Sequence, residues 1–371
     1  MELAVRLARR GYGTTSPNPM VGAVLVKSGR IIGRGWHRRA GGPHAEIEAL
    51  GDAQKHGRAV RGATLYVTLE PCSTHGRTPP CTEAILAAGL RRVVAGATDP
   101  NPKHAGQGFK ILRSAGLEVI RDPLAGECER LNEAFNHWIV HRTPFVTVKA
   151  AMTLDGKIAT ADGESKWITG EKARAEGMRL RRGSDAILVG VNTVLADDPS
   201  LTARTPGKAG DSRPAKPLRR IILDSLARTP LTARVVSDEF AAWTTMVVSA
   251  RAPARRLSAL ARKVAVIAAP SAVGQGRAAI ALPWLLAKLG SEDVSSLLVE
   301  GGGEVNASFL LGGLAQRVAF FYAPKILGGR DARKAVAGEG AGSLREVVQL
   351  GEVEWRKLGK DLLLSARVIP A

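Results

Sequence analysis

The stretch Pro43-His44-Ala45-Glu46 stands upstream of Cys72 and Cys81, and together these residues supply one imidazole, two thiols and one carboxylate. Imidazole nitrogen and thiolate sulfur are ligands that Zn²⁺ prefers, and three protein ligands leave one position of a tetrahedral ion open. Water held at that position loses a proton near neutral pH. The pattern therefore predicts a catalytic zinc site made of His44, Cys72 and Cys81, with Glu46 beside it.

The spacing of the two cysteines departs from the usual form of this pattern. In zinc deaminases a His-x-Glu segment is followed by Pro-Cys-x-x-Cys, and the Glu moves protons without binding the metal. Here residues 73–80 separate Cys72 from Cys81. A chance collection of residues is the plain alternative, because buried free cysteines are common in proteins.

Local sequence patterns place the candidate ligands at the ends of predicted elements. Residues 64–69 alternate and are rich in β-branched side chains, which predicts a strand that ends shortly before Cys72. A helix is predicted over residues 82–88, with Cys81 at its start, and another begins after His44. Because the positive end of a helix favours a thiolate, two helix N-termini are expected to converge on one metal ion.

Length and composition indicate a globular protein of more than one domain. At about 150 residues per domain, a chain of 371 residues is expected to contain two or three. No run approaches the ~18 apolar residues of a membrane span, and the charged N-terminus lacks a signal-peptide core. Three cysteines, an odd number used in a metal motif, favour a reducing compartment, so we expect a cytoplasmic protein without a membrane partner.

The strongly basic balance raises the question of a nucleic-acid partner. The formal net charge is +19, and basic residues exceed acidic ones in both halves, without a basic tail. Aromatic residues are only 4%, so platforms on which bases could stack are sparse. A diffuse positive field that attracts a phosphorylated substrate is the preferred interpretation, and RNA stays open because some zinc deaminases act on it.

Strand and helix signals alternate in the first half, which predicts an α/β layered domain. Gly116 is a candidate helix C-cap before the last strand of this half. The expected strands are 23–26, 31–33, 64–69, 92–97 and 117–120, and the expected helices are 2–10, 45–55, 82–88, 108–115 and 126–140.

A domain boundary is expected at His141-Arg142-Thr143-Pro144, because a proline biases the preceding residue away from helix. We therefore divide the chain into domains 1–143 and 144–371. The second half repeats the α/β pattern, and residues 203–217, rich in Gly, Pro, Lys and Arg, are expected to form a mobile loop. The expected strands are 145–150, 186–189, 220–223, 245–248, 264–267, 296–299 and 318–322.

A second site is expected where several of these strands end. Strand 296–299 leads into Glu300-Gly301-Gly302-Gly303-Glu304 and then a helix, a turn that lets a phosphate reach backbone N–H groups. A plain tight turn is the alternative, because glycine runs alone are weak evidence. Polar residues also follow strands in segments 149–157, 163–169 and 188–199, and ligands of open α/β sheets bind outside the carboxyl ends of strands.

Three motifs taken together resemble one family. They are Thr15-Ser16-Pro17-Asn18-Pro19-Met20-Val21-Gly22-Ala23-Val24, Ala40-Gly41-Gly42-Pro43-His44-Ala45-Glu46, and Glu70-Pro71-Cys72 with Gly76-Arg77-Thr78-Pro79-Pro80-Cys81. They resemble the bifunctional deaminase–reductases of riboflavin biosynthesis, whose longer loop between the cysteines accounts for the spacing. The resemblance covers nearly the whole chain. It implies a cytidine-deaminase-like three-layer α/β/α domain followed by a dihydrofolate-reductase-like α/β domain.

The resemblance implies two consecutive reactions. The 2-amino group of 2,5-diamino-6-(5-phosphoribosylamino)pyrimidin-4(3H)-one is hydrolysed to ammonia in the first. NADPH then reduces the ribosyl group, which gives 5-amino-6-(5-phosphoribitylamino)uracil. The implied cofactors are Zn²⁺ and NADPH, and the implied partners are this phosphoribosyl-aminopyrimidine and further copies of the chain, as a dimer or tetramer.

The resemblance also assigns roles to individual residues. His44, Cys72 and Cys81 hold zinc, Glu46 is the acid–base residue, and Asn18 bonds the pyrimidine. Matches to NADPH-contacting positions are Ala151, Trp167, Thr193, Asp197, Ser225, Gly302, Gly303, Glu304, Val305, Asn306, Ala307 and Ser308. Matches to substrate positions are Ser165, Arg181, Leu201, Arg204 and Glu300, with Lys149 and Asp155 in the same motif. Arg181 and Arg204 suit a sugar phosphate, because a guanidinium group binds phosphate through two hydrogen bonds.

One departure from the family lies in the zinc loop. Members usually have His two residues after the first Cys, where this chain has Thr74, followed by His75. Two other functions stay open at this point. A nucleic-acid-editing deaminase with an appended binding domain is favoured by the charge and opposed by the second half. A zinc-stabilised regulatory module without activity is supported by Thr74 alone.

Overall fold

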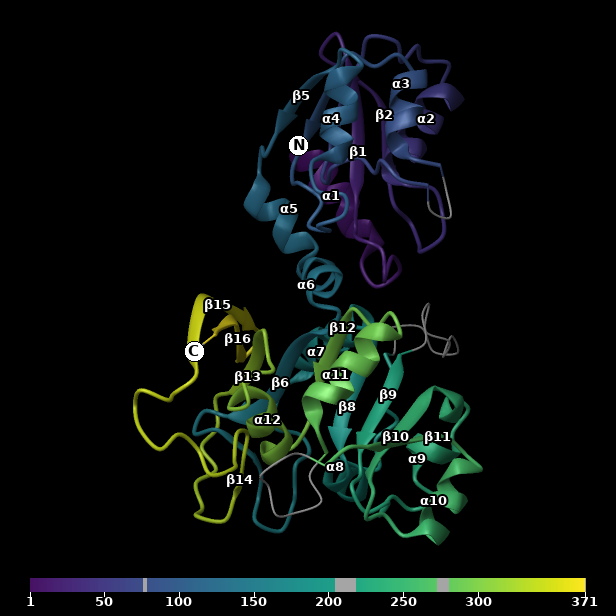
Figure 1. Cartoon of the computed structure of the whole chain (residues 1–371). Coiled ribbons are helices and arrows are strands. Elements are labelled where there is room, and N and C mark those ends of the chain that lie inside the picture. Colours follow the sequence, from purple (N-terminus) through teal and green to yellow (C-terminus); the bar gives the residue numbers. More distant parts are fainter. Residues whose placement is uncertain (76–78, 204–217, 272–279, 371) are drawn as a thin grey trace. The chain divides into compact units, whose positions relative to one another are not determined.

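The chain forms two compact units, Met1–Arg142 and Thr143–Ala371. The structure is a computed structural model that describes residues 1–75, 79–203, 218–271 and 280–370 (Figure 1). The division falls one residue before the boundary that Pro144 indicates. None of the helices in these ranges is long and apolar enough to cross a membrane.

The first unit is built on a five-stranded sheet with the order β2-β1-β3-β4-β5 among its described residues. Strand β1 is antiparallel to β2 and β3, whereas β3, β4 and β5 run parallel. Alternate residues of β1 face opposite layers: Val24 packs against helix α1, and Leu25 lies in the core shared with helices α2, α3 and α4. The three-layer α/β/α fold is therefore present (Figure 1). Its elements are α1 Glu2–Ala8, η1 Arg9–Gly11, β1 Gly22–Lys27, β2 Arg30–Trp36, α2 Ala45–Lys55, β3 Thr64–Val67, α3 Cys81–Ala87, β4 Arg92–Ala95, α4 Gln107–Ser114, β5 Glu118–Arg121, α5 Ala125–Leu131 and α6 Glu133–His141.

Two glycines of β2 set how closely helix α2 approaches the sheet. A Cβ atom at Gly35 would collide with the carbonyl oxygen of Ala45, and one at Gly33 would collide with that of Ala49. The helix backbone therefore lies directly on the strand. This packing fixes the start of α2, where His44 is the N-cap residue and Glu46 lies in the first turn.

The single helix predicted over residues 126–140 is wrong, because the structure breaks it at Asn132 into α5 and α6. The Asn132 side chain is 5% exposed, accepts a hydrogen bond from Met20 N (2.7 Å) and donates one to Met20 O (3.0 Å). Pairing a buried amide with a distant backbone outweighs the helical pattern. Cys128 on α5 is 1% exposed and packs in the core, as the sequence predicts, and Gly116 follows α4 with φ 86°.

The described residues of the second unit form a nine-stranded sheet with the order β11-β10-β9-β8-β12-β6-β13-β16-β15. From β11 to β13 in this order, each strand runs parallel to its neighbour. Strand β16 is antiparallel to both of its neighbours, β13 and β15. Neighbouring residues of β8 face opposite cores, with Leu188 toward α11 and α12 and Ile187 toward α9 and α10. The described elements are β6 Phe145–Thr153, β7 Lys157–Ala159, α7 Glu171–Arg182, β8 Ala186–Gly190, α8 Val191–Asp197, β9 Arg219–Leu223, α9 Arg234–Ser237, η2 Ala241–Trp243, β10 Thr244–Ser249, α10 Ala254–Ala261, β11 Ala265–Ala269, α11 Leu282–Ser291, β12 Ser296–Val299, α12 Gly303–Leu310, β13 Arg317–Ala323, β14 Arg333–Lys334, β15 Gln349–Leu358 and β16 Asp361–Ile369.

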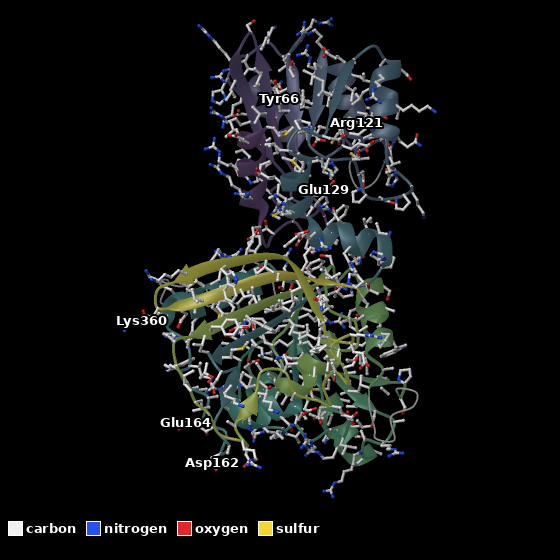
Figure 2. The ribbon with its side chains drawn as sticks, turned by 90° about the vertical axis from the view of Figure 1, so that its left-hand side faces the viewer. Tyr66, Arg121, Glu129, Asp162, Glu164 and Lys360 are labelled. Atoms are coloured by element: carbon white, nitrogen blue, oxygen red, sulfur yellow. The ribbon has the colours of Figure 1, made fainter. Side chains whose placement is uncertain are left out.

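The sequence patterns missed the two antiparallel strands at the end of this sheet. Strand β15 is an edge strand, and charged residues such as Glu354 and Arg356 hide its alternation. It turns back at Lys360 into β16, which lies between β13 and β15 (Figure 2). Strands β7 and β14 form a separate, two-stranded antiparallel sheet, which the sequence patterns did not indicate. Most of the loop expected over 203–217 falls outside the described residues.

Candidate active sites

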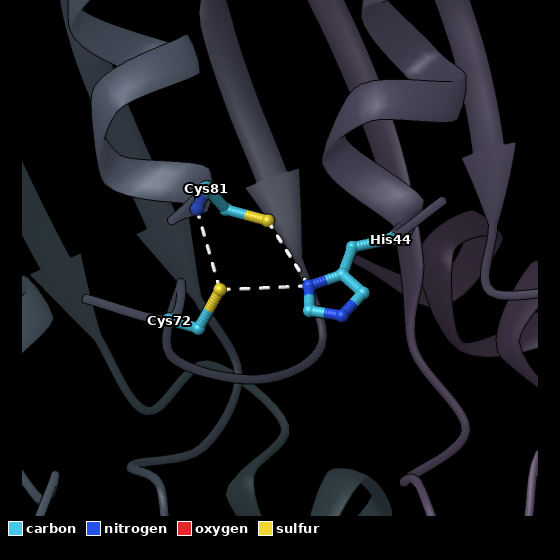
Figure 3. Close-up of side chains that lie close together, drawn as sticks. All are labelled: His44, Cys72 and Cys81. Carbon is cyan, nitrogen blue, oxygen red and sulfur yellow. Dashed lines mark hydrogen bonds between the residues drawn. The ribbon is translucent and has the colours of Figure 1, made fainter. Parts of the chain in front are cut away.

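The predicted zinc ligands meet at one point of the first unit (Figure 3). His44 Nδ1 lies 3.2 Å from Cys81 Sγ and 3.5 Å from Cys72 Sγ, and the three ligand atoms lie within 4.8 Å of one another. Bonds of about 2.0–2.3 Å to a tetrahedral ion would separate such atoms by about 3.3–3.8 Å. The arrangement of one nitrogen and two sulfurs therefore fits Zn²⁺.

The elements that carry these ligands explain their convergence. His44 is the N-cap of α2, Cys81 is the first residue of α3, and Cys72 follows β3. The backbone N–H of Cys81 donates to Cys72 Sγ at 3.3 Å. Two helix N-termini thus meet at the ligand set, as the sequence predicts.

The two thiols are coupled through their shared hydrogen bond. That bond and His44 lower the pKa of Cys72 to about 4, although burial opposes the shift. The same bond, together with burial, raises the pKa of Cys81. A divalent cation attracts both sulfurs and favours loss of the second proton.

Glu46 is placed for proton transfer beside the ligands. Its side chain is 4% exposed in the first turn of α2, and burial raises its pKa to about 6. A carboxyl group with a pKa near neutrality can both accept and donate a proton. Its position next to His44 and Cys81 agrees with the acid–base role that the resemblance implies.

His37 is a site residue that sequence reasoning missed. It is 2% exposed, its ring meets that of His44 edge-on at 5.4 Å, and burial lowers its pKa, which favours the neutral ring. Its Nδ1 donates to Pro43 O at 2.9 Å, which leaves Nε2 to accept from Asn18 Nδ2 at 3.1 Å. This pair fixes the amide orientation of Asn18. The feature of the sequence that could have indicated His37 is its position seven residues before His44, in the segment that leads to this ligand.

Glu70, also missed as a site residue, supports the zinc loop from behind. Its buried carboxylate accepts hydrogen bonds from the backbone N–H groups of Asp99, Gly106 and Gly108 at 2.9–3.1 Å. These bonds tie the start of α4 to the segment that leads to Cys72. Thr74 and His75 are exposed, and His75 Nε2 lies 3.9 Å from Glu83 Oε1.

A second cluster of charges lies in the other unit, where Glu300 follows β12, Lys149 lies within β6 and Arg181 is near the end of α7. Arg181 donates to Glu300 through Nε (2.8 Å) and Nη2 (3.0 Å), and Lys149 Nζ lies 3.4 Å from the same carboxylate. Burial alone would raise the pKa of Glu300, but Arg181 and then Lys149 lower it to about 2. Three of the expected substrate positions are thus brought together with a net positive charge.

The remaining expected substrate positions behave differently. Ser165 Oγ donates to Asp197 Oδ1 at 3.1 Å, which joins a substrate position to a cofactor position. Both oxygens of Asp155 accept hydrogen bonds within the chain, from Thr153, Leu327 and Gly328, and these bonds lower its pKa to about 2. Leu201 is 2% exposed, so its side chain belongs to the core. Arg204 lies outside the described residues.

The glycine turn after β12 fits a phosphate group. Gly302 is the N-cap of α12, and a Cβ there would meet open space, whereas one at Gly303 would collide with Lys334 O. The positive end of α12 therefore has open space beside Gly302, where a phosphate could approach backbone N–H groups. Asn306 and Ala307 are buried beneath the turn, and Glu304 and Ser308 are exposed, with Val305 between them.

The other expected cofactor positions come from several different elements of the second unit. Ala151 is on β6, Thr193 on α8 after β8, and Ser225 follows β9. Trp167 is 67% exposed, and Arg174 lies 4.6 Å above its ring. Trp167 lines a hollow of about 610 Å³, together with residues that include Lys172, Lys325 and Lys360.

Asp361 is a further residue that the sequence did not single out. It is 3% exposed, and its Oδ2 accepts the N–H of Gly170, the N-cap of α7, at 2.8 Å. The carboxylate therefore stabilises the positive end of the helix that carries Arg181. Its partner is too far away in the sequence for any local pattern to indicate the contact.

Comparison with known proteins matches both units. The family model of the cytidine and deoxycytidylate deaminase zinc-binding region matches residues 1–97, and that of the RibD C-terminal domain matches residues 144–364. Riboflavin biosynthesis protein RibD of Actinobacillus pleuropneumoniae is 42% identical over 100% of this chain and 94% of its own length. The Escherichia coli protein of that name is 40% identical, over 98% and 97%.

The chain belongs to the RibD family. Solved structures agree with this assignment. Acinetobacter baumannii RibD superposes with a TM-score of 0.85 at 35% identity, covering 99% of this chain and 97% of that one. A deaminase/reductase of Thermotoga maritima gives 0.80 at 36% identity, covering 100% and 97%. The protein is therefore a bifunctional enzyme with a zinc-binding deaminase domain and an NADPH-dependent reductase domain, and a nucleic-acid-editing deaminase is not favoured.

Proposed function

We propose that the enzyme deaminates 2,5-diamino-6-(5-phosphoribosylamino)pyrimidin-4(3H)-one and then reduces the ribosyl group of the product with NADPH. The Thermotoga maritima relative is named for this deaminase and for 5-amino-6-(5-phosphoribosylamino)uracil reductase. The observation that carries the proposal is that one chain contains both the His44–Cys72–Cys81 set and the Glu300–Arg181 cluster. Domains 1–143 and 144–371 would perform the two steps in turn.

In the deaminase domain, zinc held by this site would supply a water molecule of lowered pKa for the hydrolysis. The Glu46 carboxylate accepts a proton from that water and later donates it to the departing amine, since its pKa near 6 suits both transfers. Asn18, oriented by His37, presents its amide oxygen to a donor group of the pyrimidine. His44, Cys72 and Cys81 hold the metal.

In the reductase domain, NADPH supplies a hydride. We assign its phosphates to the N-terminus of α12 at Gly302–Ser308, with Ala151, Trp167, Thr193, Asp197 and Ser225 as further contacts. Lys149, Arg181 and Glu300 face the substrate, together with Ser165 and Asp155. The net positive charge of the Glu300 cluster favours a phosphorylated ligand. Because Glu300 occupies much of the Arg181 guanidinium, we assign the main phosphate contact to Arg204.

A coupled assay tests this proposal. The diaminopyrimidine phosphate is supplied with NADPH, and ammonia and NADPH are followed together. We expect ammonia to appear first and NADPH to be oxidised in equal amount, and the deaminated uracil to be reduced without ammonia release. Oxidation of NADPH that precedes ammonia, or ammonia release from cytidine alone, would contradict the proposal.

We also propose a cytoplasmic homo-oligomer. Exposed apolar side chains gather on the outer strands of the second unit, where Trp355 is 58% exposed and Leu362 40% exposed. The Trp355 ring contacts Tyr322 at 5.9 Å, so the patch extends onto β13. Such a patch suits contact with a second copy. Light scattering on Trp355→Glu beside the unmodified enzyme tests it, and an unchanged mass would count against this surface.

A further inference from the structure

The loop after α8 carries a proposed substrate contact on its backbone. Leu201 matches a substrate position, yet its side chain is 2% exposed in the core formed with β8, β9 and β10. Because the side chain is packed in this core, a ligand would have to meet Leu201 through its peptide groups. Leu201 has φ 49° and Asp198 has φ 39°, a backbone region that residues other than glycine rarely adopt. The path of this loop must be held by its surroundings.

Arg220 on β9 holds that path from the core. Its side chain is 1% exposed, and all five of its N–H groups are used. Nη1 donates to Ser200 O at 2.9 Å, and Nη1 and Nη2 donate to the two carboxylate oxygens of Asp238 at 2.7 and 2.8 Å. Nε donates to Thr244 Oγ1 at 2.8 Å, and Nη2 to Val235 O at 3.1 Å.

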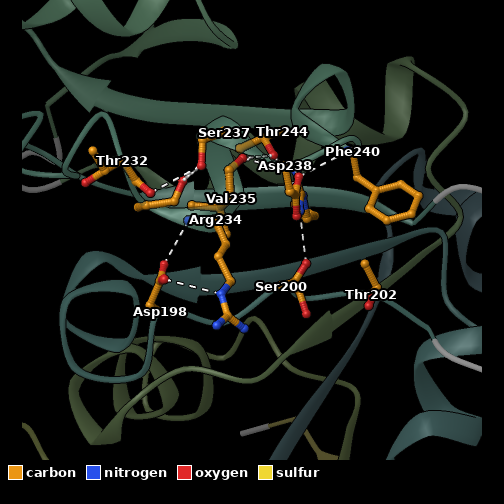
Figure 4. A network of polar contacts seen from close by, with 12 residues as sticks. Asp198, Ser200, Thr202, Thr232, Arg234, Val235, Ser237, Asp238, Phe240 and Thr244 are labelled. Carbon is orange, nitrogen blue, oxygen red and sulfur yellow. Dashed lines mark hydrogen bonds and ion pairs between the residues drawn. The ribbon is translucent and has the colours of Figure 1, made fainter. Parts of the chain in front are cut away.

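The loop is fixed on both sides of Leu201. Arg220 bonds the carbonyl of the preceding residue, and Arg181 Nη1 bonds the carbonyl of the following residue, Thr202, at 3.1 Å. The start of the loop is tied to the same short helix that meets Arg220, because Arg234 N donates to Asp198 Oδ1 at 2.8 Å. Figure 4 shows part of this network, with Asp198 beside Arg234 and Ser200 facing the group around Asp238.

We infer that Arg220, held by Asp238, is a positioning residue that sets the backbone of Leu201 for substrate binding in the reductase domain. The inference rests on the proposed function. Among the described residues, Arg220 makes no hydrogen bond to the proposed ligand positions themselves. It acts through Ser200 O, while Arg181 links the other end of the loop to Glu300.

The test compares Arg220→Lys with Arg219→Met in the full-length enzyme. Lys keeps a buried cation beside Asp238, but one ammonium group cannot also reach Ser200 O and Val235 O. Arg219 is the neighbouring residue of the same strand and pairs with Glu292 nearer the surface. Both variants are assayed with the phosphoribosyl-aminouracil and NADPH, and ammonia release is measured on the diaminopyrimidine.

For Arg220→Lys we expect the KM for the aminouracil to rise about 10- to 100-fold, because small misplacements of a binding group have effects of this size. The KM for NADPH, the kcat and ammonia release should change little, and Arg219→Met should resemble the unmodified enzyme. Asp238→Asn, which loosens the same guanidinium without removing it, should raise the KM in the same direction. A selective KM change is something that a merely structural role does not produce.

Two outcomes overturn the inference. One is an unchanged KM for the aminouracil in both Arg220→Lys and Asp238→Asn. The other is a parallel loss of aminouracil and NADPH binding together with a lowered melting temperature, which would indicate general destabilisation. An unmodified enzyme that fails to reduce the aminouracil would instead contradict the proposed function, so the two failures are distinguishable.

Discussion

The two charged centres of this protein are built on opposite principles. The His44–Cys72–Cys81 centre gathers groups that lose protons, and it needs a cation to balance them. The cluster of Glu300, Arg181 and Lys149 balances most of its charge internally and keeps a positive excess. The first centre is therefore suited to hold a metal ion, and the second to attract an anionic substrate.

The largest effect should follow from removing a zinc ligand. In Cys81→Ser, a hard hydroxyl replaces a thiolate, so we expect the zinc content to fall and ammonia release to drop to background. Reduction of the supplied aminouracil should continue, because its residues lie in the other unit. Metal analysis and the two assays measure this. Cys128→Ser, a buried cysteine outside the ligand set, is the matched control, and equal zinc loss in both variants would argue against the assigned set.

A smaller effect is expected when the metal stays and proton transfer is lost. Glu46→Gln should lower the rate of deamination by about 10²- to 10⁴-fold, the usual contribution of a general acid–base group. Zinc content and aminouracil reduction should match those of the unmodified enzyme. Ammonia release at the normal rate from zinc-loaded Glu46→Gln would exclude the proposed role.

The internally balanced centre should respond to acid. The pKa of Glu300 is about 2 in the folded enzyme, below its ordinary value of 4.5, so its stabilising contribution is complete above about pH 4.5 and is lost as the pH falls toward 2. Glu300→Gln leaves two cations unpaired and should cost about 3–5 kcal/mol in the second unit. Unfolding followed from pH 7 to pH 2 measures both.

The control for this experiment is Glu292→Gln, which breaks a more exposed pair with Arg219 and should cost at most ~1 kcal/mol. If Glu300→Gln lost no more stability than this control, or kept the acid dependence of the unmodified enzyme, the buried pair would not be the source of either effect.

The smallest effect concerns orientation within the deaminase site. In His37→Phe, the Asn18 amide loses its partner, which is worth about 0.5–1.5 kcal/mol and so a roughly 2- to 13-fold rise in the KM of deamination. Zinc content should not change. An unaltered KM would mean that Asn18 is held by other contacts, whereas lost zinc would mean that His37 supports His44 instead.

The sequence predicted the first centre far better than the second. Each zinc ligand stands next to the start of a helix or the end of a strand, so local patterns locate His44, Cys72 and Cys81 together. Lys149 was expected just after a strand, but it lies within β6, where it meets Glu300 after β12.

What the sequence could not predict are contacts between distant segments. The amide of Asn132 breaks a helix because it meets Met20, and the core position of Leu201 depends on strands that follow it. Likewise, the five bonds of Arg220 join three separate elements. No local periodicity encodes these pairs, because each depends on how the layers pack.

Asp361 at the start of β16 caps helix α7, and β16 lies inside the sheet of the second unit, between β13 and β15. During synthesis, helix α7 and its Arg181 emerge long before the residue that completes them. The reductase half must therefore remain unfinished until its final strand has been made, whereas the deaminase half can already be folded. The order of the two reactions is thus also the order in which the two catalysts become complete.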